Sequence, residues 1–150
     1  MNKDQFLFRG VRSYDKNVIE GNLIIDNEGE KHIVPFDMID RDGHHLRIDS
    51  DEPMFFEQDS INQFSGLTDK SSIRIFSDDI RIDHLGVKFR IYQTVGGFVV
   101  KSSVWASNLN DLVLGDELVT SSLSDPQTAA YICESTVGFS NVWDEKQLKK

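Results

Sequence analysis

Alternation of apolar and polar residues constrains this chain most, because a period of two belongs to strands and not to helices. The clearest case is GVKFRIYQ, residues 86–93, whose apolar side chains would face one side of a sheet and whose basic ones the other. The same alternation marks NVIEGNLIID at residues 17–26. Turn-forming pairs such as Asp42-Gly43 and Gly96-Gly97 separate these segments. The pattern predicts a mainly β chain.

Individual elements follow from this pattern. DNEGEK, residues 26–31, has the composition of a hairpin loop, and HIVPF then returns as a strand that Pro35 ends. We expect a buried strand at Met54–Phe56 and a hairpin over Gly86–Trp105.

Helical signals are few. Asp125 is suited to the N-cap and Pro126 to the first helical position, which predicts a short helix over Gln127–Glu134. The final KQLKK is expected to be a frayed end.

Size and cysteine content set further bounds. The chain has 150 residues, enough for one domain or two small lobes. Its single cysteine, Cys133, allows no intramolecular disulfide, which fits a cytoplasmic location. The first residues, MNKDQFLFRG, lack the apolar core of a signal peptide, and no apolar run approaches the roughly 18 residues of a membrane span.

The formal net charge is −9, and the acidic residues are spread along the chain. Such a surface repels phosphate backbones and so disfavours nucleic acid as a partner. Two interpretations remain: a charge that keeps the protein in solution, or a preference for basic partners.

A central stretch resembles a known family. DSINQFSGLTDKSSIRIFSDDI, residues 59–80, is similar to the signature of the YopX-like family of bacteriophages and mobile elements, which runs close to PETVGQFTGLTDKNGKKIFEGDIV. FLFRG near the start and VGFSNVWDEKQL near the end are weaker similarities in the same order. Four positions where the family usually has glycine carry other residues: Asn62, Ser72, Asp78 and Ser140.

The resemblance implies an all-β fold of two lobes. We expect an N-terminal β lobe at residues 1–65 and a C-terminal lobe at residues 66–150, the latter a small SH3-like barrel with one short helix near its end. It also implies an accessory protein of phage or mobile-element origin, and no reaction.

The stretch QFSGLTDK is interpreted as a turn that joins the lobes. Glycine would allow the chain to reverse, and the aspartate would accept hydrogen bonds from amides two residues on. The motif residues are Gln63, Phe64, Gly66, Leu67, Asp69, Lys70 and Asp79. Each has a structural task, so the motif needs no ligand; the alternative is a loop that contacts a peptide or nucleic acid.

Tests for catalytic and metal chemistry mostly fail. Asp40–Glu52 has carboxylates and two histidines, but Met38 stands where a calcium loop needs its first acidic ligand. We interpret this segment as a hairpin tip, with weak surface binding of a divalent ion left open. Cys133 has no basic neighbour and is expected in the core. The sequence predicts no enzyme, no cofactor, no dedicated metal site and no small-molecule substrate.

One set of residues suggests a binding surface. Aromatic and basic side chains of the predicted hairpin would share a face, and these are Lys88, Arg90, Tyr92, Lys101 and Trp105. Base stacking on a small barrel and ordinary core packing are both open interpretations. We therefore expect a non-catalytic β module that binds a protein partner or a second copy of itself. The alternative is a binder of single-stranded nucleic acid that uses the C-terminal barrel.

Overall fold

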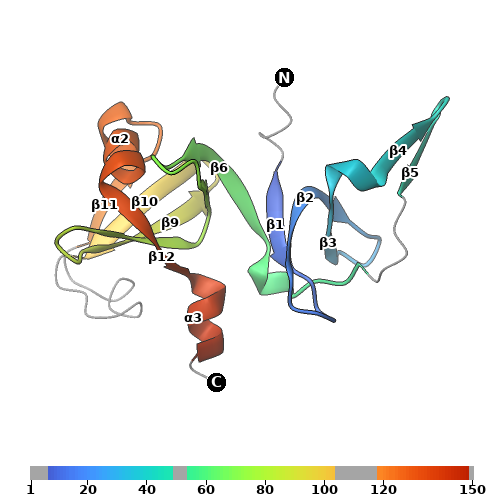
Figure 1. Ribbon diagram of the computed structural model, residues 1–150, viewed down its shortest axis with the longest axis horizontal. Helices are drawn as coiled ribbons and strands as arrows, with labels where there is room; N and C mark the ends of the chain where they lie inside the picture. Colours follow the sequence, from blue (N-terminus) through green and yellow to red (C-terminus); the bar gives the residue numbers. More distant parts are fainter. Residues whose placement is uncertain (1–6, 49–53, 104–117, 149–150) are drawn as a thin grey trace. The chain divides into compact units, whose positions relative to one another are not determined.

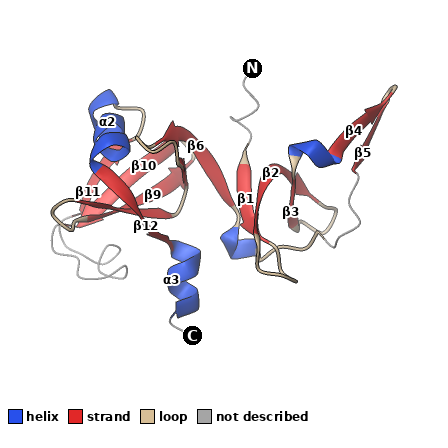
Figure 2. Ribbon diagram, viewed as in Figure 1, coloured by secondary structure: helices blue, strands red, loops and turns tan. Residues whose placement is uncertain are grey.

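The computed structural model describes residues 7–48, 54–103 and 118–148. Strands predominate (Figure 2), so the prediction of a mainly β chain is confirmed. The chain divides into two compact units, residues 1–64 and 65–150, where the sequence suggested a boundary after residue 65. Within its described residues, no helix is long and apolar enough to cross a membrane.

The first unit is built on an antiparallel sheet (Figure 1). Its strands are β1 (Phe8–Val11), β2 (Val18–Ile25) and β3 (Lys31–Val34), and the first residues of β6 (Asn62–Thr68) pair with β1. The buried apolar side chains of this unit are Leu7, Val11, Ile33, Val34, Phe56 and Phe64. A separate hairpin pairs β4 (Ile39–Asp42) with β5 (His45–Ile48). It reverses at Gly43, as the Asp42-Gly43 pair predicted.

The prediction of a strand at Met54–Phe56 is wrong. Only Phe56 makes a β-bridge, to Arg12, and Phe55 leaves 57% of its surface exposed. A short apolar run does not by itself distinguish a strand from an extended linker. The chain continues into a 3₁₀ turn, η3 (Gln58–Ser60), and another such turn, η2 (Phe36–Met38), follows Pro35.

The second unit is a twisted antiparallel sheet in the order β11-β10-β9-β8-β12. The bounds of its elements are β7 (Arg74–Phe76), β8 (Asp79–Asp83), β9 (Lys88–Thr94), β10 (Gly97–Ser103), β11 (Leu118–Ser122), α2 (Pro126–Ser135), β12 (Thr136–Asn141) and α3 (Val142–Leu148). The β9–β10 pairing confirms the predicted hairpin, and its turn is Val95-Gly96, one residue before the predicted Gly96-Gly97 pair. Helix α2 lies across one face of the sheet (Figure 1), where Ile132 packs with buried Ile91 and Val100.

Several C-terminal predictions can be compared with these elements. Helix α2 is confirmed: the Asp125 side chain accepts the Thr128 amide and Pro126 begins the helix. The expectation of a single helix with a frayed KQLKK end is wrong, since α3 runs to Leu148. The SH3-like barrel is not confirmed, because the described strands form no closed barrel. Trp105 lies outside the described residues.

Two of the four glycine-like positions adopt the left-handed conformation. Ser72 has φ 64° and Asp78 has φ 63°, in the turns that precede β7 and β8. Asn62 and Ser140 instead lie within β6 and β12, with no positive φ. An L-residue in the left-handed region costs roughly 1–2 kcal/mol, so the two turns keep a glycine geometry without glycine.

This strain predicts the effect of restoring glycine. Ser72→Gly should raise the free energy of unfolding by about 0.5–1 kcal/mol, because relief of the left-handed strain exceeds the added chain entropy of glycine. Urea denaturation followed by circular dichroism measures the change. Ser71→Gly is the matched control, since Ser71 has no positive φ and glycine there should only destabilise. Equal effects of the two substitutions would contradict the assignment.

Candidate functional site

Most of the QFSGLTDK motif is a strand, and only its last two residues, Asp69 and Lys70, enter a turn. Residues 62–68 form β6, and Gly66 lies inside that strand with φ 89° and with open space on the side where a β-carbon would point. The reversal comes later, where the Ser72 amide donates to the Asp69 carbonyl. The prediction failed because glycine suggested a turn, while the pairing of the flanking residues keeps the chain extended. Phe64 is buried and Leu67 packs against the core of the second unit, as expected.

Asp69 organises the turn that follows β6. One carboxylate oxygen accepts the amides of Ser71 (2.8 Å) and Ile73 (3.0 Å), which confirms the predicted hydrogen bond two residues on. The other oxygen lies 2.9 Å from Nη2 of Arg81, and both side chains are almost fully buried. Arg81 also donates from Nε to the hydroxyl of Thr136 (2.8 Å) and from Nη2 to its carbonyl (3.0 Å).

These contacts set the charge state of Asp69. Burial raises the pKa of the Asp69 carboxyl, but hydrogen bonds from Ile73, Arg81 and Ser71 outweigh it and hold that pKa below its ordinary value. The carboxylate is therefore ionised at neutral pH and fully used within the fold. Asp79 has a similar task, since its side chain accepts the Phe76 amide at 2.8 Å.

The remaining motif and cysteine residues show no reactive arrangement. The Lys70 side chain is exposed, and its backbone amide donates to the carbonyl of Cys133. Gln63 pairs with Phe8 in the sheet of the first unit. Burial raises the pKa of the half-buried Cys133 thiol, which disfavours the reactive thiolate.

The four predicted binding residues that the structure describes, Lys88, Arg90, Tyr92 and Lys101, share one face of the second sheet. Register pairs Arg90 with Lys101, and strand alternation places Lys88 and Tyr92 on the same side. Arg90 lies over the Tyr92 ring with its guanidinium carbon 4.1 Å from the centroid, and the Lys101 nitrogen lies 4.7 Å from that centroid. We call this set, with Phe139, the basic-aromatic face. It lies opposite the face that α2 covers.

Phe139 and Asp78 belong to this surface although the sequence did not assign them. The Lys88 nitrogen lies 4.4 Å from the centroid of Phe139, which comes from β12 and is 49% exposed. Asp78 accepts a hydrogen bond from Nη2 of Arg90 at 3.2 Å, so one of the three cations is already paired. The β8–β12 pairing brings Phe139 here, and no local signal in the sequence indicates that pairing.

The opposite face holds an apolar cavity of about 270 Å³ beneath α2. Two of its polar lining residues are engaged within the fold: Thr128 donates its amide and hydroxyl to Asp125, and Tyr131 donates at 2.6 Å to Asp83, which is not part of the lining. The Asp83 carboxylate raises the pKa of the Tyr131 phenol, which stays protonated. This cavity therefore presents no pair of groups poised for proton transfer.

Comparison with known proteins adds no relative. No family model matches the chain, and neither does any curated protein or solved structure. The resemblance to the YopX-like family stays a prediction from residues 59–80. The functional argument therefore depends on the geometry of the described residues alone.

The Asp69–Arg81 ion pair predicts a specific stability loss. Asp69→Asn keeps the oxygen that accepts the Ser71 and Ile73 amides but turns an NH₂ group toward the buried guanidinium. Breaking a buried pair in this way should cost about 3 kcal/mol of unfolding free energy at pH 7, measured by urea denaturation. Glu134→Gln, the same change at an exposed carboxylate of α2 in this unit, should change stability by less than about 0.5 kcal/mol.

The same substitution predicts a pH dependence. The pKa of Asp69 is lower in the folded protein than the ordinary 3.8, so its stabilising contribution is present above pH 3.8 and is lost as pH falls toward the folded pKa. The stability difference between wild type and Asp69→Asn should therefore shrink between pH 5 and the acid limit of folding. A constant difference over that range would show that Asp69 does not carry the charge.

Proposed function

We propose that this protein is a non-catalytic binding module whose basic-aromatic face holds an acidic segment of a protein partner. The observation that carries the proposal is the gathering of Lys88, Arg90 and Lys101 around the half-buried Tyr92 ring and the exposed Phe139 ring in a chain of net charge −9. A cationic surface on such a chain is a local positive region within a mainly negative electrostatic potential. An anionic partner would be drawn to this face and repelled elsewhere.

The chemistry of the face suits a peptide. Phe139 and Val137 are about half exposed and offer apolar contact beside the cations. Lys88 and Lys101 lie over aromatic rings, which already restrict their side chains. They therefore lose less conformational entropy when they form ion pairs with a partner. An acidic peptide with one or two apolar side chains would match both parts.

Nucleic acid fits the same face less well. The Tyr92 ring already carries a cation at 4.1 Å and another at 4.7 Å, which competes with stacking of a base on that ring. Arg90 already has a carboxylate partner in Asp78. Binding of single-stranded nucleic acid and self-association through this face are therefore alternative outcomes of the test below.

The accessory role in a phage or mobile element, and the SH3-like topology, are further parts of this proposal that depend on the YopX-like resemblance. A role in binding agrees with the structural tasks found for Asp69 and Asp79 and with the protonated Tyr131 in the α2 cavity.

Charge reversal on the basic-aromatic face tests the proposal. Fluorescence anisotropy with a labelled Glu/Asp-rich peptide containing one leucine should show binding at low salt that weakens as salt increases. Lys88→Glu and Lys101→Glu should each weaken that binding by about tenfold, equivalent to roughly 1.4 kcal/mol. Lys146→Glu is the matched control, since it makes the same charge change at an exposed position of α3 and should leave affinity nearly unchanged.

Two results would overturn the acidic-peptide assignment. Tighter binding to labelled oligothymidine than to the peptide, lost in the same variants, would favour the nucleic-acid alternative. A dimer that light scattering detects and that Lys101→Glu dissociates, with no peptide binding, would favour self-association.

A further inference from the structure

His32 has an unusual pair of neighbours in the first unit. It lies at the start of β3, where its Nδ1 is 2.5 Å from the carbonyl oxygen of Met54. Its Nε2 is 2.8 Å from a carboxylate oxygen of Asp26, the first residue of the hairpin loop that joins β2 to β3. Both ring nitrogens therefore face oxygen atoms.

This arrangement demands a cation between His32 and Asp26. A backbone carbonyl only accepts hydrogen bonds, so Nδ1 must carry the proton in the neutral ring. The Nε2 lone pair then faces Oδ2 of Asp26, whose other carboxylate oxygen already accepts two backbone amides. Two acceptors at 2.8 Å repel each other unless a proton or a metal ion lies between them.

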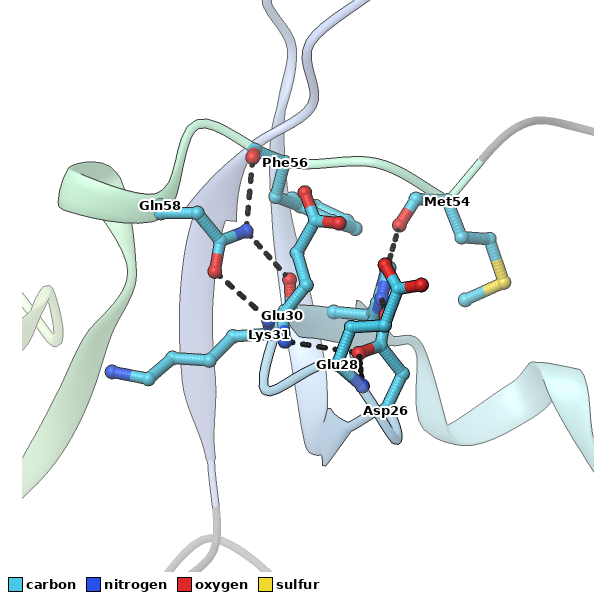
Figure 3. A network of polar contacts seen from close by, with 8 residues as sticks. Asp26, Glu28, Glu30, Lys31, Met54, Phe56 and Gln58 are labelled. Carbon is cyan, nitrogen blue, oxygen red and sulfur yellow. Dashed lines mark hydrogen bonds and ion pairs between the residues drawn. The ribbon is translucent and has the colours of Figure 1, made fainter.

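The hairpin loop fixes Asp26 so that one oxygen is directed at the ring. Its Oδ1 accepts the amides of Glu28 (2.9 Å) and Glu30 (3.0 Å), which leaves Oδ2 for Nε2 of His32. The Glu30 carboxylate offers a third potential metal ligand. The ligand atoms of Asp26, Glu30 and His32 all lie within 4.8 Å of one another. Figure 3 shows Asp26 and Met54 at one end of this network and Gln58 at the other.

Residues other than Asp26, Glu30 and His32 fix the orientation of the His32 imidazole. The contact from Nδ1 to the Met54 carbonyl is the outer-shell bond that typically orients a metal-binding histidine and leaves Nε2 as the ligand. Phe55 packs edge-on against the imidazole at 5.7 Å between centroids. Gln58 clamps the neighbouring Lys31 backbone through Nε2 (2.9 Å) and Oε1 (2.8 Å), as Figure 3 shows.

We propose that Asp26, Glu30 and His32 form a binding site for a divalent transition-metal ion of the Zn²⁺ type. Zinc–ligand bonds of about 2.0–2.2 Å place tetrahedral ligands roughly 3.3 Å apart, so Nε2 and Oδ2 need to separate by only about half an ångström. One nitrogen and two carboxylates favour Zn²⁺ over Ca²⁺, which prefers oxygen ligands alone. Water would complete the coordination. The sequence predicted only a loop for residues 26–31 and no metal site.

Isothermal titration calorimetry of the full chain with ZnCl₂ at pH 7.5 tests the site. Binding of one ion per chain is expected, with no comparable heat from CaCl₂ and reversal by EDTA. His32→Gln and Glu30→Gln should each weaken binding by about tenfold or more, a loss expected at least as large as that from removing an outer-shell partner. Glu28→Gln, in the same loop but outside the triad, and His44→Gln, an exposed histidine of the β4–β5 turn, are the matched controls and should leave affinity unchanged.

Long-range ¹H–¹⁵N NMR of the imidazole separates the metal from a proton and does not depend on variants that must fold. Zinc should leave a single proton on Nδ1 and shift Nε2 to a metal-bound frequency. The proposal is overturned if His32 keeps protons on both nitrogens in excess zinc at pH 7.5. It is also overturned if no zinc binds, or if binding persists unchanged in His32→Gln and Glu30→Gln.

Discussion

The buried guanidinium of Arg81 is the constraint on which the second unit depends. A charge with 2% of its side chain exposed is tolerated only where an opposite charge and further hydrogen bonds replace water. Asp69 supplies the charge and Thr136 supplies two oxygens. The pair therefore ties the turn after β6, the middle of β8 and the start of β12 to a single point.

Strand alternation gives the sheet of the second unit one face that packs in the core and one face that carries basic side chains. Side chains at Phe89, Ile91 and Val100 face α2 and the core, while Arg90 and Lys101 face the other way. The two faces of an antiparallel sheet can carry different side chains, and among the described residues the face away from α2 concentrates cations and rings. The cations are held by contacts with aromatic rings and with Asp78, so the surface is preorganised before any partner arrives.

Much of the fold could be predicted from the sequence because alternation and helix capping depend on neighbouring residues. The contacts that depend on pairing between distant segments could not be predicted. The β9–β10 hairpin and the Asp125 cap follow from residues close together in sequence. The burial of Arg81 does not, because an arginine between two isoleucines looks like the solvent side of a strand until Asp69 and Thr136 are placed. Gly66 led to the wrong prediction of a turn, because a glycine inside a strand has the same local sequence signal as a glycine in a turn. The triad of Asp26, Glu30 and His32 could have been noticed from its spacing across a tight hairpin loop.

The position of Thr136 along the chain has a consequence for folding during synthesis. The first unit has its core residues by Phe64, whereas Arg81 cannot be hydrogen-bonded fully until Thr136 has been added 72 residues later. Arg81 itself is synthesised 55 residues before Thr136, an interval of roughly 3–11 s at typical synthesis rates. The nascent second unit must carry a solvated Arg81 through this time, so assembly proceeds from the N-terminal unit onward and the second core closes in one late step.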